Sequence, residues 1–295
     1  MMSKERDVLR RFLIGNHLRG EWIRLNTTWR TVLNRTDYPE AVSQYLGQAL
    51  AATALLSATI KFDGKMTLQI RGTGPLHLLV VQVNSNRGVR CTAKWRNTLP
   101  DEISSLHDVF GTDAQLLMSV NTSGGQERYQ GIVDLRGSSL SEALETFFLQ
   151  SEQLPSYFWL HSDMTCVAGL MIQKMPGAPE DDDSLNRVKM LSDTVTAHEL
   201  INLDAEQLLW RLYHEEGVSL YEPQGVHFEC YCSTEKTRHL VQSLGAEEAK
   251  HILSEEGAIT ITCEFCHACY TFDAIDVAQI FNADATGHDG NQTRH

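Results

Sequence analysis

The sequence predicts an α+β protein with three parts: a mixed α/β N-terminal domain, a helical linker and a small C-terminal zinc-binding domain. Three observations predict this organisation. Strand and helix patterns alternate over residues 1–177, the charge becomes strongly acidic beyond them, and five of the seven cysteines lie after residue 229. A chain of 295 residues with 42% hydrophobic content is long enough for two domains with cores of their own.

Local patterns predict the elements of the first domain in order. Alternating apolar and polar residues predict a strand over 19–26, and apolar residues at helical spacing after Pro39 predict a helix over 37–56. A second helix is predicted over 139–154. Further strands are predicted at 65–72, 75–84, 88–95, 114–121, 127–135 and 156–162. The glycines of residues 122–126 predict a hairpin loop, which gives Gln126 a place in a turn rather than a catalytic role.

The chain has no segment typical of a membrane span. Its richest apolar stretch, residues 45–60, is too short for a bilayer and includes Gln48 and Ser57. The N-terminus has charges on both sides of its few apolar residues and no cleavage site typical of a signal peptide. We therefore expect a cytoplasmic protein with no membrane partner. Thiols are kept reduced there, so close cysteine pairs more often bind metal or do redox work than form standing disulfides.

The distribution of charge predicts the domain boundaries. Residues 1–177 carry 18 basic against 16 acidic side chains, a net charge of +2. The next segment, 178–222, has a net charge of −8, and residues 223–295 have a net charge of −7. An acidic C-terminal half would repel nucleic acid, so no nucleic-acid partner is expected.

The linker, residues 178–222, is predicted to hold two helices after the pattern breaks near Pro176. Asp204 and Gln207 form a capping-box pattern before the second helix, which Gly217 closes. The apolar stripe of the first helix consists of Leu185, Val188, Leu191 and Val195. Because this segment has little apolar surface, its order should depend on the surface against which it packs. Its composition equally fits an ordinary interdomain linker.

Four cysteines predict a tetrahedral zinc site. Cys230 and Cys232 would project from the same side of an extended segment, and Cys263 with Cys266 forms the C-x-x-C of a chelating turn. The site could simply stabilise a small domain, since zinc binding is worth on the order of 10 kcal/mol or more in small zinc modules. It could also be a switch, because a disulfide within either pair removes two of the four ligands.

The remaining cysteines and two histidines are interpreted as residues outside the site. Cys269 extends the second pair to C-x-x-C-x-x-C, which leaves open a spare thiol, an alternative ligand or a competing disulfide partner. We favour a non-ligand, because four thiolates already complete a tetrahedral site. His227 and His267 flank ligands but are expected to be exposed and unliganded. Cys91 and Cys166 lie in strand-like segments and are predicted to be buried.

Two other functions use similar cysteine patterns. A thioredoxin-like thiol-disulfide oxidoreductase has its C-x-x-C early in the fold at a strand-to-helix turn, a context absent here. A zinc-ribbon nucleic-acid module should be basic around its ribbon, whereas residues 223–295 are acidic. Both stay as alternatives.

The whole chain resembles the 33 kDa chaperonin family, the bacterial redox-regulated heat-shock chaperones. The C-x-C and C-x-x-C pairs are the most specific carriers of the resemblance. The others are "DYPEAVSQYLGQALAATALLSATIKFDG" at 37–64, "GQERYQG" at 125–131, "QSEQLP" at 150–155 and "LLWRLYHEE" at 208–216. Cys269 departs from the family pattern, because it adds a third cysteine to the second pair.

The resemblance implies a chaperone that holds unfolding proteins without ATP, not an enzyme, and no P-loop G-x-x-x-x-G-K-[ST] occurs in the chain. By this resemblance the reduced protein is idle, with one zinc ion held by Cys230, Cys232, Cys263 and Cys266. Oxidation would join Cys230 to Cys232 and Cys263 to Cys266, release the metal and unfold the zinc domain and the linker. The implied partners are aggregation-prone client proteins, ATP-dependent refolding chaperones and, after oxidation, a second copy in a homodimer.

Overall fold

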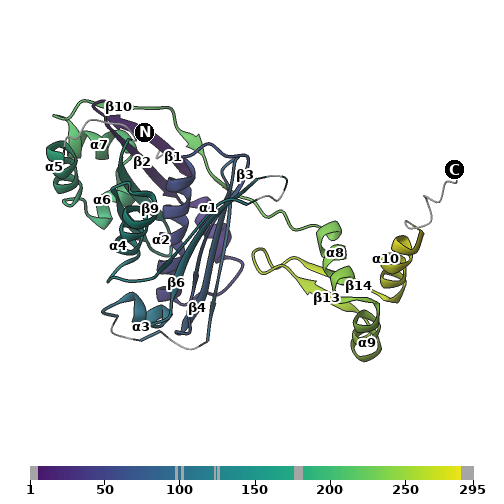
Figure 1. Ribbon diagram of the computed structural model, residues 1–295. Helices are drawn as coiled ribbons and strands as arrows, with labels where there is room; N and C mark the ends of the chain where they lie inside the picture. The colour runs from purple at the N-terminus through teal and green to yellow at the C-terminus, as the bar shows by residue number, and fades with distance from the viewer. Residues whose placement is uncertain are drawn as a thin grey trace, which may run out of the picture. The chain divides into compact units, whose positions relative to one another are not determined.

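The computed structural model describes residues 6–96, 99–100, 103–122, 124, 127–175 and 182–286. The chain divides into two compact units, Met1–Glu229 and Cys230–His295 (Figure 1). Within the described ranges, no helix has both the length and the apolar character that crossing a membrane requires. The architecture confirms the predicted α+β class.

The described part of the first unit contains two six-stranded sheets, which we call sheet 1 and sheet 2. In spatial order, sheet 1 contains β10 (Val218–Leu220), β1 (Val8–Ile14), β2 (Leu18–Leu25), β9 (Val167–Lys174) and β8 (Ser156–Ser162), with β11 (Gln224–Gly225) also paired to β1. Sheet 2 contains β12 (His227–Phe228), β5 (Gly88–Trp95), β4 (Leu76–Asn84), β3 (Gly64–Arg71), β6 (Gln115–Thr122) and β7 (Glu127–Asp134). Apart from the parallel pair of β12 and β5, neighbouring strands run antiparallel.

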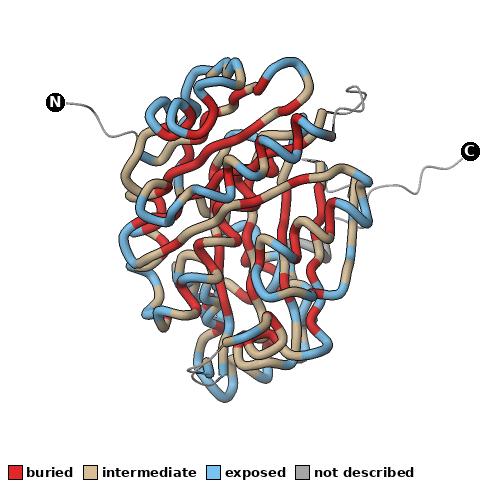
Figure 2. The backbone as a smooth tube through the Cα atoms, turned by 90° about the vertical axis from the view of Figure 1, so that its left-hand side faces the viewer, coloured by how far each residue is buried: buried red, intermediate tan, exposed pale blue. Residues whose placement is uncertain are grey.

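Helix α2 (Glu40–Ser57) forms the centre of the first unit. It contacts β8 and β9 of sheet 1 and β4 and β5 of sheet 2, and 13 of its 18 residues are buried, as a helix between two sheets requires. A Cβ atom at Gly47 would lie 2.0 Å from the Oγ atom of Ser162, so the close approach of α2 to β8 needs a glycine. Buried stretches, red in Figure 2, lie inward, and exposed stretches, pale blue, mostly follow outer turns.

Three shorter helices lie in the part of this unit that precedes the linker. They are α1 (Thr27–Leu33), α3 (Leu106–Phe110) and α4 (Leu140–Phe147), the last continued by a π-helical turn, η1 (Phe148–Glu152). The side chain of Ser139 accepts a hydrogen bond from the backbone N–H of Glu142 and so begins α4. The helix predicted over 139–154 is therefore confirmed.

The seven predicted strands of the first domain are all present, but two strands were not predicted. Residues Val167–Lys174 form the inner strand β9, which is buried on both faces except at its last residue, so it shows no alternation. Strand β1 carries Arg10 and Arg11 in its middle. These two adjacent charged residues interrupt the alternation of apolar and polar residues by which a strand is recognised. The antiparallel pair of β6 and β7 confirms the predicted hairpin, whereas Gln126 lies outside the described residues.

The linker contains three described helices, where two were predicted. They are α5 (Asp182–Ser192), α6 (Ala197–Asn202) and α7 (Ala205–Tyr213), and we call them the linker helices. The extra helix arises because Thr196 and Glu199 form a capping box of their own, which leaves Val195 in the turn before α6. The predicted box of Asp204 and Gln207 does begin α7. The predicted break near Pro176 lies outside the described residues.

Strand β9 separates two apolar clusters by simple alternation. Its residues Val167 and Met171 belong to the cluster around α2, whereas Ala168, Leu170 and Ile172 belong to the cluster that includes the linker helices. Because successive strand residues point to opposite faces, the linker helices cover the face of sheet 1 that α2 does not.

The second unit is small. Its elements are α8 (Thr234–Leu244), α9 (Ala246–Glu256), β13 (Ile259–Thr262), β14 (Cys269–Phe272) and α10 (Ala274–Thr286), with β13 and β14 forming an antiparallel pair. The buried apolar residues described for this unit are Val241, Ala249, Ile259, Phe272, Val277 and Ile280. Such a core gives little stability without a further cross-link. The boundary between the two compact units falls after Glu229. The predicted bounds of the linker, 178–222, and of the zinc-binding domain, 223–295, remain predictions.

Candidate metal and redox site

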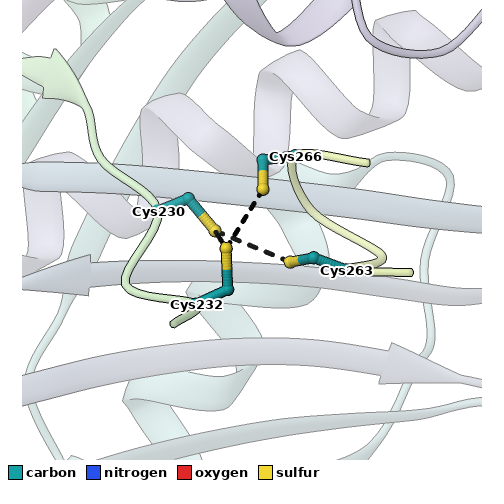
Figure 3. Close-up of side chains that lie close together, drawn as sticks. All are labelled: Cys230, Cys232, Cys263 and Cys266. Carbon is teal, nitrogen blue, oxygen red and sulfur yellow. Dashed lines mark hydrogen bonds between the residues drawn. The ribbon is translucent and has the colours of Figure 1, made fainter. Parts of the chain in front are cut away.

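The four predicted cysteine ligands lie together in the second unit. Figure 3 shows their sulfur atoms turned toward one another from two separate segments. The Sγ atoms of Cys230, Cys232, Cys263 and Cys266 all lie within 4.8 Å of one another. The Sγ–Sγ distance is 3.5 Å between Cys230 and Cys232, 3.6 Å between Cys230 and Cys263, and 3.3 Å between Cys232 and Cys266.

Two tight local structures hold these sulfurs in place. Cys232 immediately precedes Ser233, and Cys230 lies two residues before Cys232. The side chain of Ser233 accepts a hydrogen bond from the backbone N–H of Lys236 and begins α8. Cys263 and Cys266 lie in the turn between β13 and β14. There the backbone N–H of His267 donates to the carbonyl oxygen of Cys263 at 2.8 Å, and His267 has a positive φ of 57°.

The geometry fits a cation bound by four thiolates. Sulfurs on a tetrahedron with metal–sulfur bonds of about 2.3 Å are about 3.8 Å apart, close to the distances above. A site made of four sulfurs selects zinc or iron over harder cations such as Mg²⁺ and Ca²⁺. The four residues could therefore hold one such metal ion.

Without a cation, Cys263 and Cys266 favour the protonated thiol. Burial is the main cause that raises the pKa of Cys263, and it also raises the pKa of Cys266 to about 12, with the neighbouring thiols adding to the rise at Cys266. A bound cation reverses this preference, because a coordinating thiol is deprotonated. Metal binding at this site would thus release protons.

The other cysteines and the two histidines lie outside the four-sulfur cluster. Cys269 is exposed, and its Sγ lies 3.5 Å from Oγ1 of Thr262 across the β13–β14 pair. His227 and His267 are exposed, with His227 3.5 Å from the carboxylate of Glu229. Cys91 and Cys166 are buried, as predicted, and burial raises the pKa of both thiols.

A second candidate site is the contact between the linker helices and sheet 1. From the linker, Leu185, Val188, Leu200, Leu208, Leu209 and Leu212 are buried there. From the sheet, Phe12, Leu18, Trp22, Ala168, Leu170 and Ile172 are buried in the same cluster. The rings of Phe12 and Tyr213 stack across this contact with centroids 6.1 Å apart. The stripe predicted for the first linker helix thus faces this sheet.

Hydrogen bonds also join sheet 1 to the linker. Nη1 of Arg24, on β2, donates to the carbonyl oxygens of Leu203 at 2.7 Å and Ile201 at 3.3 Å. Nε1 of Trp159 donates to Asp193 at 3.1 Å. Sequence reasoning missed these residues, because a lone arginine in a strand does not reveal which face it occupies or what covers that face.

Comparisons with known proteins cover almost the whole chain. A family model described as "Hsp33 protein" matches residues 7–273. A protein of Nitrosococcus oceani named "33 kDa chaperonin" is 43% identical over 277 residues, which are 94% of each chain. A protein of the same name from Shewanella denitrificans is 40% identical over 290 residues, covering 98% of this chain and 99% of that protein.

The fold also matches a solved structure. The crystal structure of a 33 kDa chaperonin from Thermotoga maritima aligns with a TM-score of 0.80, and the alignment covers 95% of this chain and 99% of that one. The two sequences are only 18% identical, so this likeness bears on the fold alone.

Proposed function

The chain belongs to the Hsp33 family, as its sequence motifs predicted, and from this premise we propose that it is a redox-regulated holdase. In this proposal it binds unfolding proteins without ATP and keeps them from aggregating under oxidative stress. It catalyses no reaction. The reduced, zinc-bound form is idle, and oxidation activates it.

The observation that carries the proposal is the four-sulfur cluster in a unit with a very small core. Cys230, Cys232, Cys263 and Cys266 would hold zinc, which supplies the cross-link that such a core lacks. The structural stability of the unit then depends on the oxidation state of its thiols. Oxidation of the four thiols would therefore unfold the second unit.

The redox chemistry balances with a peroxide as oxidant. Each pair of zinc-bound thiolates loses two electrons as its S–S bond forms. One hydrogen peroxide molecule takes up these two electrons and two protons from the solvent and becomes two water molecules. We propose that Cys230 pairs with Cys232 and Cys263 with Cys266, on the resemblance to the family. The sulfur distances do not select this pairing, because Cys232 lies 3.3 Å from Cys266 and 3.5 Å from Cys230.

The linker helices act as a cover in this account. They bury an apolar face of sheet 1 that could otherwise bind unfolded chains through nonspecific contact. When the zinc-binding unit unfolds, the linker loses its C-terminal anchor and leaves the sheet. Both surfaces then become available to clients.

The implied partners follow from this role. Clients are unfolded or aggregation-prone proteins, and they pass to ATP-dependent refolding chaperones when the stress ends. We expect a homodimer after oxidation and a cytoplasmic location. A membrane or nucleic-acid partner is not expected.

Disulfide mapping of the peroxide-treated protein, combined with an aggregation assay, tests the proposal. We expect two disulfides within the pairs named above and suppression of aggregation of a thermally unfolding client. A crossed bond between Cys232 and Cys266 would overturn the pairing. Reduction of insulin at catalytic rates would favour an oxidoreductase, and a salt-sensitive DNA gel shift would favour a nucleic-acid module.

A further inference from the structure

An extended segment of the first unit, residues 218–229, lies along the edges of both sheets, and we call it the strap. Its strands β10 and β11 pair with β1 of sheet 1, and its strand β12 pairs with β5 of sheet 2. On their other sides, β1 pairs with β2 and β5 pairs with β4. Without the strap, β1 and β5 would therefore be open edge strands.

Main-chain hydrogen bonds hold the strap to these edges. The backbone N–H groups of Tyr221 and Val226 donate to the carbonyl oxygens of Arg11 at 2.9 Å and Asp7 at 2.8 Å, beside sheet 1. The N–H groups of His227 and Glu229 donate to the carbonyl oxygens of Arg87 at 3.3 Å and Val89 at 2.9 Å, on sheet 2. Such contacts do not depend on which side chains the added strand carries.

Arginine side chains at the two edges add to this main-chain recognition. Nε and Nη2 of Arg10 donate to the carbonyl oxygen of Tyr221 at 3.0 and 2.9 Å. Nε of Arg87 donates to the carbonyl oxygen of Gly225 at 3.2 Å. Both arginines thus bind backbone atoms of the strap, which any polypeptide could supply.

Side chains of the strap contribute only part of its attachment. Val226, at 4% exposure, is its one fully buried residue, whereas Val218, Leu220 and Phe228 are half-buried against the two apolar clusters. The remaining strap residues are exposed or half-buried. A segment held mainly by main-chain bonds at sheet edges opens at a lower free energy cost than a core strand. The strap also runs between the linker helices and Cys230, so the proposed activation would free it at both ends.

We propose that the edges of β1 and β5 bind client proteins by strand addition once the strap has left them. This proposal rests on the proposed holdase function and names its client site. The occupant is an extended segment of an unfolded polypeptide, whose main-chain groups are hydrogen-bonded to water and can exchange it for a sheet edge. The strap itself demonstrates that an extended chain fits both edges. Because Ser219, Gln224 and His227 are exposed, the fit leaves the side chains at these positions unconstrained.

A competing peptide tests the proposal on the full-length, peroxide-oxidised protein. The probe is a synthetic peptide with the sequence of residues 218–229, and its matched control carries N-methyl groups at Tyr221 and Glu229. The control keeps every side chain but loses one hydrogen bond to each sheet. We expect the unmodified peptide to displace a fluorescent unfolded client, and the control to compete at least about tenfold more weakly.

The other outcomes separate failure of strand addition from failure of the holdase function. If the oxidised protein binds client but neither peptide competes, or both compete equally, strand addition is wrong and the holdase function stands. If the unmodified peptide dissociates an oxidised dimer without displacing client, the edges belong to a second copy and the proposal fails. If the oxidised protein binds no client at all, the holdase function fails as well.

Discussion

The guanidinium of Arg24 donates a hydrogen bond of 2.7 Å from Nη1 to the main-chain carbonyl oxygen of Leu203 and so joins sheet 1 to the linker. Arg24 is only 2% exposed and lies over the ring of Trp22, 5.2 Å from its centroid. The carbonyl oxygens of Ile201 and Leu203, at the end of α6, are acceptors for this buried cation. Departure of the linker would remove both acceptors at once.

Replacing Arg24 with Met should weaken linker docking. Met keeps an apolar stem but cannot donate, and hydrogen bonds involving a charged group contribute about 1.5–3 kcal/mol. We expect faster hydrogen exchange in α6 and α7 of the reduced protein, with zinc content unchanged. Arg30→Met, at an exposed position of α1, is the control. Equal exchange in both variants would show that Arg24 does not hold the linker.

Leu209→Ser should give holdase activity in the reduced protein without oxidant. Leu209 is 2% exposed, and its burial is worth roughly 1.5 to 3 kcal/mol of docking free energy. The new hydroxyl would also be buried at an apolar contact. Trp210→Ser is the matched control, because Trp210 is the next residue of α7 and is 71% exposed. The measurement is suppression of client aggregation by zinc-replete protein.

The Leu209 variant also separates two routes of activation. If hydrogen exchange shows a destabilised linker while the variant stays idle, the linker is not an inhibitory cover. Activation must then come from the zinc-binding unit itself.

Cys269→Ser should leave one zinc ion per chain, because Cys269 is exposed and lies outside the four-sulfur cluster. Cys266→Ser removes a proposed ligand three residues earlier in the chain and should lower the bound zinc sharply. Metal analysis of the two reduced variants checks both expectations. Loss of zinc in the Cys269 variant would make this residue a ligand and displace one of the four.

Peroxide treatment should remove hydrogen-exchange protection from the linker helices and the second unit while the first domain stays folded. Helix α2 and the inner strands have a core that includes no member of the cysteine cluster, so they keep their protection. Segment-resolved exchange before and after oxidation measures this. An equal loss of protection in all segments would contradict the division into a stable domain and a part whose folding depends on the reduced cysteines.

Features that depend on a few neighbouring residues could be predicted from the sequence. The helix after Pro39, the capping box of Asp204 and Gln207 and the cluster of four cysteines each have a local pattern. Features set by distant neighbours could not. Strand β9 has no alternation because both its faces are covered, and β12 is only two residues long. The place of Arg24 under the linker depends on which face of β2 is inward.

Zinc content and aggregation suppression, measured on one sample before and after peroxide at elevated temperature, test whether zinc release and chaperone activation occur together. We expect one zinc ion per chain and no suppression in the reduced sample, followed by loss of zinc and gain of suppression together. Full suppression by the reduced, zinc-bound sample, or loss of zinc with no gain of suppression, would show that zinc release does not activate the protein.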